Sequence, residues 1–338
     1  MDPAVIWYVI VGVLFAGFVL LDGYDLGIGV MHLLVREKGL KNALRPVIAP
    51  VWDGNEVWLV VGGGALFAAF PVAYANVFSS FYTAFMLFLF AVMFRAASIE
   101  LAHFFEVRWW QVFWDLAFGL SSLVLALLLG VAMGNLVAGL PLDADGIFRG
   151  GLRGLLRPYP LMTGLTALVL LTLHGAAMAA LKCSKPFDQT AREWVLRLSV
   201  LFVGLYAILT FWTLRFLPHM SQAMREYPAL FLIPFLTLLS VVNIPHWAWR
   251  GNDRLTLLST SFTILGLLAL FGAGMFPNLV LSVPEPSHSL TLWNSSSSDK
   301  TQFIMLVITA MGMPLVIAYQ IAVHWIFRGR ISPDDSSY

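Results

Sequence analysis

Charged residues and cysteine are both scarce in this chain. Only 12% of its 338 residues are charged and 59% are hydrophobic, with a mean hydropathy of +0.81. This balance excludes an ordinary soluble globular domain. The single cysteine, Cys183, excludes an intrachain disulfide, and no CxxCH sequence is present that would attach a c-type haem covalently. The composition therefore indicates a polytopic membrane protein.

The amino terminus lacks the positively charged segment of a signal peptide. It reads MDPAVIWY and continues into an apolar stretch that is too long for a signal-peptide core, so we expect it to be a retained span. The net charge of +1 gives no reason to expect nucleic acid as a partner. Without an internal repeat or a soluble segment at either end, we expect residues 1–338 to form a single membrane domain.

Apolar runs long enough to cross a bilayer recur along the whole chain. A membrane-spanning helix needs about 20 mainly apolar residues, and these runs are too long and continuous for barrel strands. The predicted fold is therefore all-α, with nine transmembrane helices packed in helix bundles. The runs lie near residues 5–33, 48–70, 74–97, 112–137, 159–181, 195–216, 228–247, 255–281 and 303–327.

The distribution of lysine and arginine predicts the orientation. If the amino terminus is outside, only six of the 20 basic residues fall in outer connections, and the remaining 14 fall in inner ones. Because basic residues concentrate in cytoplasmic loops, this predicts the amino terminus outside and the carboxyl terminus inside. The six are Arg149, Arg153, Arg157, Arg215, Arg225 and Lys300.

Two pairs of acidic residues are predicted at the cytoplasmic end of the first two spans. The stretch LDGYDLGIGV at 21–30 contains Asp22 and Asp25, and PVWDGNEVW at 50–58 contains Asp53 and Glu56. Each pair has i, i+3 spacing, so its two carboxylates share one helix face. Acids within a span face protein or water rather than lipid. We expect the two pairs to lie at the same level of the membrane.

The next two spans add acids at this level, Glu100 at the end of the third and Asp115 at the start of the fourth. Partly desolvated carboxylates that lie close together can both take up and release a proton, which would suit a proton path open to the cytoplasm. An alternative is that the acids cap helices and pair with interfacial arginines. The arginines available for such pairs are Arg36, Arg45, Arg95 and Arg108.

The seven histidines form no recognisable ligand pattern for a metal or a haem. Only His174 lies clearly within a predicted span, no pair has i, i+4 spacing, and there is no HExxH or Cys/His cluster. A single histidine in a membrane helix is more often hydrogen-bonded between helices than a ligand. The sequence therefore predicts no cofactor bound by this chain.

Several motifs together carry a family resemblance. The chain contains DGYDLGIG at 22–29, APVWDGNEVWL at 49–59, GGGALFAAFP at 62–71, FSSFY at 78–82, VAMGN at 131–135, GMFPN at 274–278 and SLTLWNSSSS at 289–298. In these motifs, which follow in order from the first span to the last, the chain resembles subunit II of cytochrome bd quinol oxidases.

The resemblance implies a function for the complex. Such oxidases reduce dioxygen to water with electrons from membrane quinol and support proton motive force in the cell membrane, the inner membrane where there are two, of bacteria and archaea. The resemblance implies that haem b, haem d and the quinol-oxidising loop belong to subunit I, which forms a heterodimer with the nine-span subunit II. We also consider a small single-span accessory subunit.

The resemblance also implies site residues. Asp53 of the WDGN motif and Asp25 of DGYD match positions on a route that carries protons toward the oxygen site, and Glu100 is a third candidate. Asp22 and Glu56 occupy further motif positions. The alternative functions are a proton-coupled secondary transporter, whose buried acids would bind the coupling ion, and a cytochrome that binds haem through two facing histidines of its own.

Overall fold

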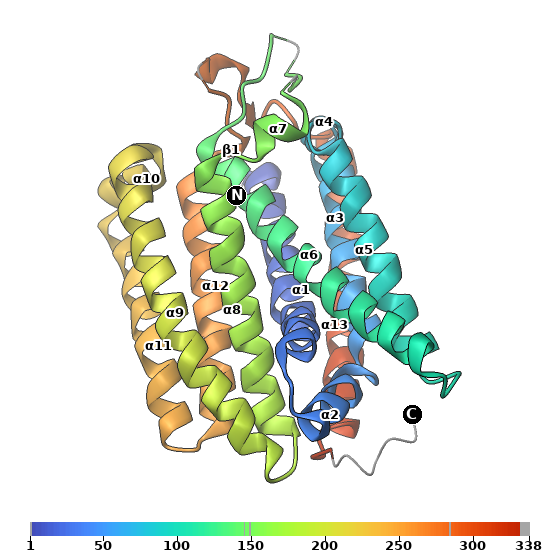
Figure 1. Ribbon diagram of the computed structural model, residues 1–338. Coiled ribbons are helices and arrows are strands. Elements are labelled where there is room, and N and C mark those ends of the chain that lie inside the picture. Colours follow the sequence, from blue (N-terminus) through green and yellow to red (C-terminus); the bar gives the residue numbers. More distant parts are fainter. Residues whose placement is uncertain (1, 145, 149, 284, 332–338) are drawn as a thin grey trace.

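In the computed structural model, long helices run side by side between the two ends of the molecule (Figure 1). The structure describes residues 2–144, 146–148, 150–283 and 285–331. The first described residues lie at one end and the last turn of α13 at the other. The long helices are α1 (Pro3–Leu34), α3 (Trp52–Ala69), α5 (Tyr82–Leu101), α6 (Arg108–Ala138), α8 (Pro158–Lys182), α9 (Phe187–Phe216), α11 (Leu232–Trp249), α12 (Asp253–Met275) and α13 (Asp299–Ile326).

Short elements cover the two ends. Helices α4, α7 and α10 lie at the amino-terminal end together with a two-stranded antiparallel sheet of β1 and β2, and α2 lies at the opposite end (Figure 1). Their bounds are α2 (Lys38–Ile48), α4 (Pro71–Ser80), α7 (Gly151–Leu155), α10 (Gln222–Glu226), β1 (Asn278–Val280), β2 (Leu290–Thr291) and the 3₁₀ turns η1 (Pro218–Ser221), η2 (Pro228–Phe231) and η3 (Pro286–His288).

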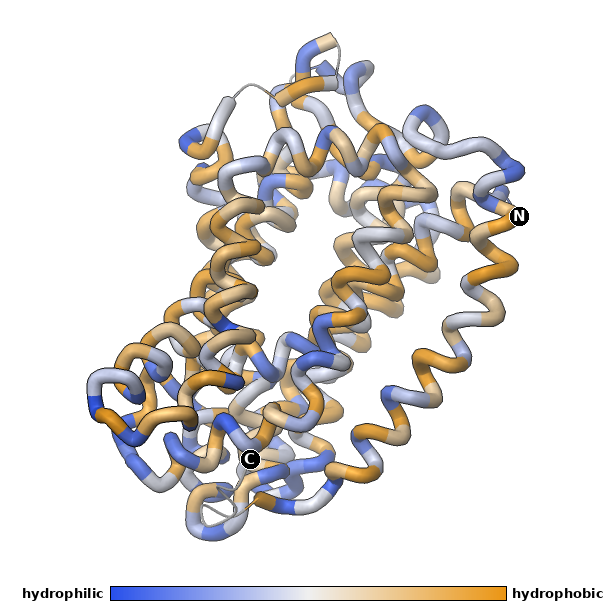
Figure 2. Tube along the Cα trace, turned by 90° about the vertical axis from the view of Figure 1, so that its right-hand side faces the viewer, coloured by the Kyte–Doolittle hydropathy of each residue, from blue (hydrophilic) through white to orange (hydrophobic). Residues whose placement is uncertain are grey.

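Eight helices of the described chain are long and apolar enough to cross a membrane. Hydrophobic residues predominate along the helices, whereas hydrophilic residues gather at the turns (Figure 2). Helix α3 is not among the eight, because its first turns contain Asp53, Asn55 and Glu56. The predicted all-α membrane fold is confirmed. The count of nine spans, the orientation and the division into one domain remain predictions, and Arg149 lies outside the described residues.

Two boundaries differ from the sequence prediction. The apolar run at 74–97 is divided between α4, which begins at Pro71, and α5, because the chain bends at Phe81. The predicted connection after the first span contains α2, which buries Leu40, Leu44 and Val47 along one stripe. This i, i+4, i+7 pattern is that of an amphipathic helix lying against the bundle.

Helix α1 lies in the centre of the bundle and packs against α3, α6 and α8. Its contact with α8 has no room for side chains at Gly27 and Gly175. A Cβ on Gly27 would overlap the carbonyl oxygen of Leu171, and one on Gly175 would overlap the backbone of Gly27. Small residues of this kind let membrane helices approach closely. The close contact buries the segment of α1 that contains Asp22 and Asp25.

We expect an impermeant maleimide to label the two ends of the molecule from opposite sides of the membrane. In a Cys183→Ser background, Ser287→Cys should react in intact spheroplasts, and Lys38→Cys only after permeabilisation, since both positions are exposed and positive connections face the cytoplasm. In the unsubstituted chain, Cys183 should not react, because burial raises the pKa of its thiol to about 12. The reverse labelling order would contradict the predicted orientation.

Candidate functional site

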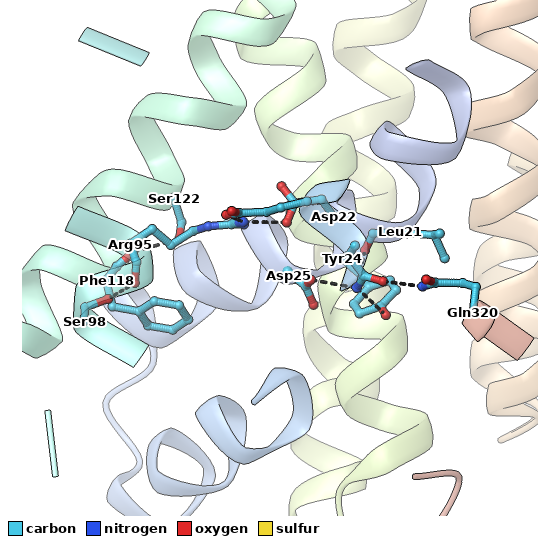
Figure 3. A network of polar contacts seen from close by, with 11 residues as sticks. Leu21, Asp22, Tyr24, Asp25, Arg95, Ser98, Phe118, Ser122 and Gln320 are labelled. Carbon is cyan, nitrogen blue, oxygen red and sulfur yellow. Dashed lines mark hydrogen bonds and ion pairs between the residues drawn. The ribbon is translucent and has the colours of Figure 1, made fainter. Parts of the chain in front are cut away.

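A buried arginine joins three helices in the part of the bundle where the acids lie. Arg95 of α5 donates from Nη2 to Asp22 Oδ1 of α1 at 2.6 Å, and the same nitrogen donates to Glu56 of α3. Figure 3 shows Arg95 and Asp22 pointing toward one another. The side chain of Arg95 is only 1% exposed and that of Glu56 is 19% exposed. The ion triad Asp22–Arg95–Glu56 is therefore buried, and Glu56 is its member with some contact with the surface.

The triad leaves an excess of negative charge in this part of the bundle. One guanidinium faces two carboxylates, and a third carboxylate, Asp25, lies one helical turn from Asp22 with no exposed surface. A buried charge is tolerated only when it is paired or hydrogen-bonded. Asp25 has no cation within ion-pair distance in the described chain, so its environment differs from that of Asp22.

An asparagine holds Asp25 instead. Asn55 of α3 is fully buried, and its Nδ2 donates to Asp25 Oδ2 and to the Tyr24 hydroxyl, each at 2.8 Å. Its Oδ1 accepts a hydrogen bond of 2.7 Å from Gln320 Nε2 of α13. Asp25, Tyr24 and Gln320 converge in Figure 3. The amide of Asn55 is thus fixed on both sides, which fixes the orientation of Asp25.

The polar contacts continue from Asn55 toward the end of α13. The hydroxyl of Tyr24 lies 3.0 Å from His324 Nε2, and Nδ1 of that histidine lies 3.0 Å from the carbonyl oxygen of Gln320. His324 is in the last turn of α13. A connected set of side chains therefore extends from fully buried Asp25 to the end of the bundle.

His174 has hydrogen-bond partners at both ring nitrogens. Its Nδ1 lies 2.7 Å from Thr260 Oγ1 of α12, and its Nε2 lies 3.1 Å from the carbonyl oxygen of Leu20. It offers no free nitrogen to a haem iron. In the described part of the chain, no three His, Cys, Asp or Glu side chains converge as ligands for a metal ion.

The structure brings together three of the five predicted acids. Asp22, Asp25 and Glu56 lie with Arg95 and the side chains bonded around Asn55 in one polar layer, whose other members are Tyr24, Gln320 and His324. Asp53 and Glu100 are exposed and form no hydrogen bond or ion pair with the described residues. The WDGN motif faces Asp25 through Asn55 rather than through Asp53.

The alternative of arginine pairing holds for some of the acids. Asp22 and Glu56 pair with Arg95, and Asp115 forms a separate cluster in which it lies 3.0 Å from both Lys41 Nζ and Arg45 Nη2. The pairing of Asp115 fastens α2 to α6.

Four residues of the polar layer were not predicted from the sequence. Asn55 and Tyr24 lie inside the family motifs but carry no charge, and the prediction rested on acidic residues. Gln320 and His324 have i, i+4 spacing on the last span, and this pattern was the available signal.

Comparison with known proteins identifies the family. A family model described as cytochrome bd terminal oxidase subunit II matches residues 3–327. The chain belongs to this family. It is 29% identical to cytochrome bd-I ubiquinol oxidase subunit 2 of Escherichia coli K12, over 98% of this chain and 95% of the relative. It is also 29% identical to cytochrome bd ubiquinol oxidase subunit 2 of Bacillus subtilis 168, over 97% and 96%.

A solved structure has the same fold. The bd oxidase from Geobacillus thermodenitrificans contains a chain that superposes with a TM-score of 0.81 at 17% identity, covering 97% of this chain and 99% of that one. Family membership makes this chain a multi-pass membrane subunit of a haem-containing terminal oxidase complex. It therefore decides against a secondary transporter.

Replacing Arg95 should destabilise the complex markedly. Arg95→Met leaves Asp22 and Glu56 without their cation, and breaking a buried pair in this way costs roughly 3–5 kcal/mol. The midpoint of thermal unfolding of the purified complex should fall, and a second substitution, Asp22→Asn, should restore part of the loss.

Arg197→Met is the matched control. Its partner Glu193 lies at 3.2 Å, but both side chains are largely exposed, and exposed pairs contribute about 0–1 kcal/mol. Equal shifts for the two arginine variants would contradict the assigned role of Arg95.

Proposed function

We propose that this chain contributes buried acidic residues to proton uptake by a terminal oxidase that takes electrons from membrane quinol and reduces dioxygen to water. The observation that carries the proposal is the burial and the fixed orientation of Asp25. This residue is fully buried, and hydrogen bonds that run from Asn55 through Tyr24 to His324 at the end of α13 fix its orientation without forming the proton route themselves. A carboxyl group oriented in this way can bind and release a proton without a large side-chain movement.

The charge balance supports a proton at Asp25. Arg95 compensates one of the carboxylates Asp22 and Glu56, and Glu56 retains some contact with the surface. Ionised Asp25 would be a further buried negative charge with only neutral hydrogen-bond donors, which is costly in a membrane interior. The proposal is that Asp25 holds a proton and passes it on when a new one arrives.

Asn55 has a positioning role in this scheme. It donates hydrogen bonds to Asp25 and Tyr24 at once. A neutral amide does not ionise in the ordinary pH range, so Asn55 orients the two neighbouring groups and does not carry the proton itself.

Two acids would supply protons from the surface. Asp53 is exposed in the first turn of α3, one turn before Glu56, and Glu100 is exposed near the end of α5. A small cavity of about 10 Å³ touches both Asp22 and Glu56, and this is about the volume that one water molecule requires. Because they are exposed, Asp53 and Glu100 would collect protons. A water molecule in the cavity would let these protons pass inward by way of Glu56 and Asp22.

The remaining parts of the oxidase are assigned to partner chains. The relatives from E. coli and B. subtilis are named as ubiquinol oxidase subunits. We propose that this chain forms a heterodimer with a subunit I, which would bind haem b, haem d and quinol. The proposed complex also includes a small single-span accessory subunit. The use of both His174 nitrogens within the protein supports an assisting subunit that binds no haem itself.

Asp25→Asn should lower quinol-dependent oxygen uptake by about 100-fold, the lower end of what a positioned proton-transfer group contributes. The haem absorption spectrum of the complex should be unchanged, because asparagine preserves the size of the side chain. Asp25→Glu should keep part of the rate, since it keeps the carboxyl group.

Asp299→Asn serves as the control, because this exposed acid lies at the opposite end of the bundle, and it should leave turnover unchanged. Normal turnover in Asp25→Asn would remove this residue from the path, and loss of haem along with activity would make its role structural.

Asp53→Asn should slow oxygen uptake by about 10-fold, less than Asp25→Asn, because water and neighbouring acids can partly replace an exposed proton collector. The direct measurement is the rate of proton uptake during quinol oxidation, followed with a pH-sensitive dye in reconstituted vesicles. An unchanged proton uptake rate would exclude Asp53 from the route while leaving Asp25 on it.

A further inference from the structure

A basic pocket lies at the end of the bundle to which the inner connections belong. It has a volume of about 390 Å³ and is formed by residues 250–252 between α11 and α12, the first two residues of α12, Leu181 at the end of α8 and Arg330 after α13. Three of its wall residues are arginines, Arg250, Arg254 and Arg330. The pocket is separate from the polar layer around Asp25 and from the proposed proton route.

The pocket retains positive charge after its internal ion pairs are counted. Its carboxylate, Asp253, is held at both oxygens by Arg192, at 2.7 and 2.8 Å. Arg330 lies farther away, 3.7 Å from the same carboxylate. Arg250 and Arg254 form no ion pair with any carboxylate of the described residues. Two exposed guanidinium groups therefore remain available to an anion.

Aromatic side chains put the pocket at the level of the lipid headgroups. Trp249 ends α11 and is 80% exposed, and Trp325 near the end of α13 is also exposed. Exposed tryptophans at the ends of spans are typical of the membrane–water boundary. The guanidinium of Arg250 lies 5.6 Å from the ring centroid of Trp247, so this basic residue is in contact with a tryptophan at the same end of α11.

An apolar track leads from the pocket along the outside of α12. Leu258 and Phe262 follow Arg254 at i+4 and i+8, and both are exposed. Residues with this spacing lie on one helix face. A ligand with a negatively charged head and long apolar chains would therefore match both parts of this surface.

We infer that the pocket binds the phosphate group of an anionic phospholipid, with the acyl chains along Leu258 and Phe262. Arginine presents several donors to a phosphate and is favoured at such sites, and basic pockets between membrane helices on the cytoplasmic side bind anionic headgroups. The lipid would bridge the α11–α12 turn to the segment after α13. In that segment the backbone nitrogen of Ile331 donates a hydrogen bond of 2.7 Å to the backbone carbonyl oxygen of Lys182. Free phosphate offers the same headgroup chemistry but cannot use the apolar track.

Lipid binding to the intact, delipidated oxidase complex tests this inference. Native mass spectrometry would compare phosphatidylglycerol with phosphatidylcholine of the same acyl chains, and inorganic phosphate would be added as competitor. The wild-type complex should prefer phosphatidylglycerol. Arg250→Gln combined with Arg254→Gln should weaken its binding about 30-fold, which corresponds to about 1 kcal/mol for each arginine.

Arg215→Gln combined with Arg225→Gln is the matched control, because both arginines are exposed at the opposite end of the bundle and Arg215 also lies beside an aromatic ring. This control should bind phosphatidylglycerol as the wild type does. Equal losses in the two double variants, or no preference over phosphatidylcholine, would overturn the inference. Complete displacement by millimolar phosphate would overturn the lipid assignment and identify a phosphate site instead. Unfolding midpoints would show that both double variants remain folded.

Discussion

The buried guanidinium of Arg95 is the interaction on which the polar layer depends. Hydrocarbon offers no water to ionised side chains, so acids placed within a span must find their partners inside the protein. Arg95 meets this requirement for Asp22 and Glu56 together, and it thereby joins α1, α3 and α5. Because its single positive charge cannot also neutralise Asp25, this acid is left with neutral partners. The distinction between a paired and an unpaired acid on one helix face underlies the proposed proton route.

Backbone packing makes this arrangement possible. The close approach of α1 and α8 at Gly27 and Gly175 encloses the polar segment of α1 on the side opposite α3. On that enclosed side His174 bonds to Leu20 and Thr260, and on the side of α3 Asn55 donates to Asp25 Oδ2. Asp25 has no exposed surface, so a proton held there would be isolated from lipid and from bulk water.

Much of the fold could be predicted from the sequence, because length and hydropathy decide whether a helix can span a bilayer. Where the prediction differs, the reason is local. The apolar run at 74–97 is continuous in hydropathy, and only the bend at Phe81 divides it. The amphipathic α2 was missed because its apolar stripe is short and lies between basic residues. Both features depend on backbone geometry and surface packing, to which a count of apolar residues is insensitive.

The candidate site divides in the same way. From the sequence alone, the class of protein, the concentration of acids near one end of the early spans and the shared face of each i, i+3 pair could be determined, because these follow from composition and helical periodicity. The partners of the acids were decided only by tertiary structure. Arg95 is 73 positions from Asp22, and Gln320 is 265 positions from Asn55. The rotation of α3 about its own axis turns Asn55 toward Asp25 and leaves Asp53 exposed, and that rotation is determined by packing against α1 and α13.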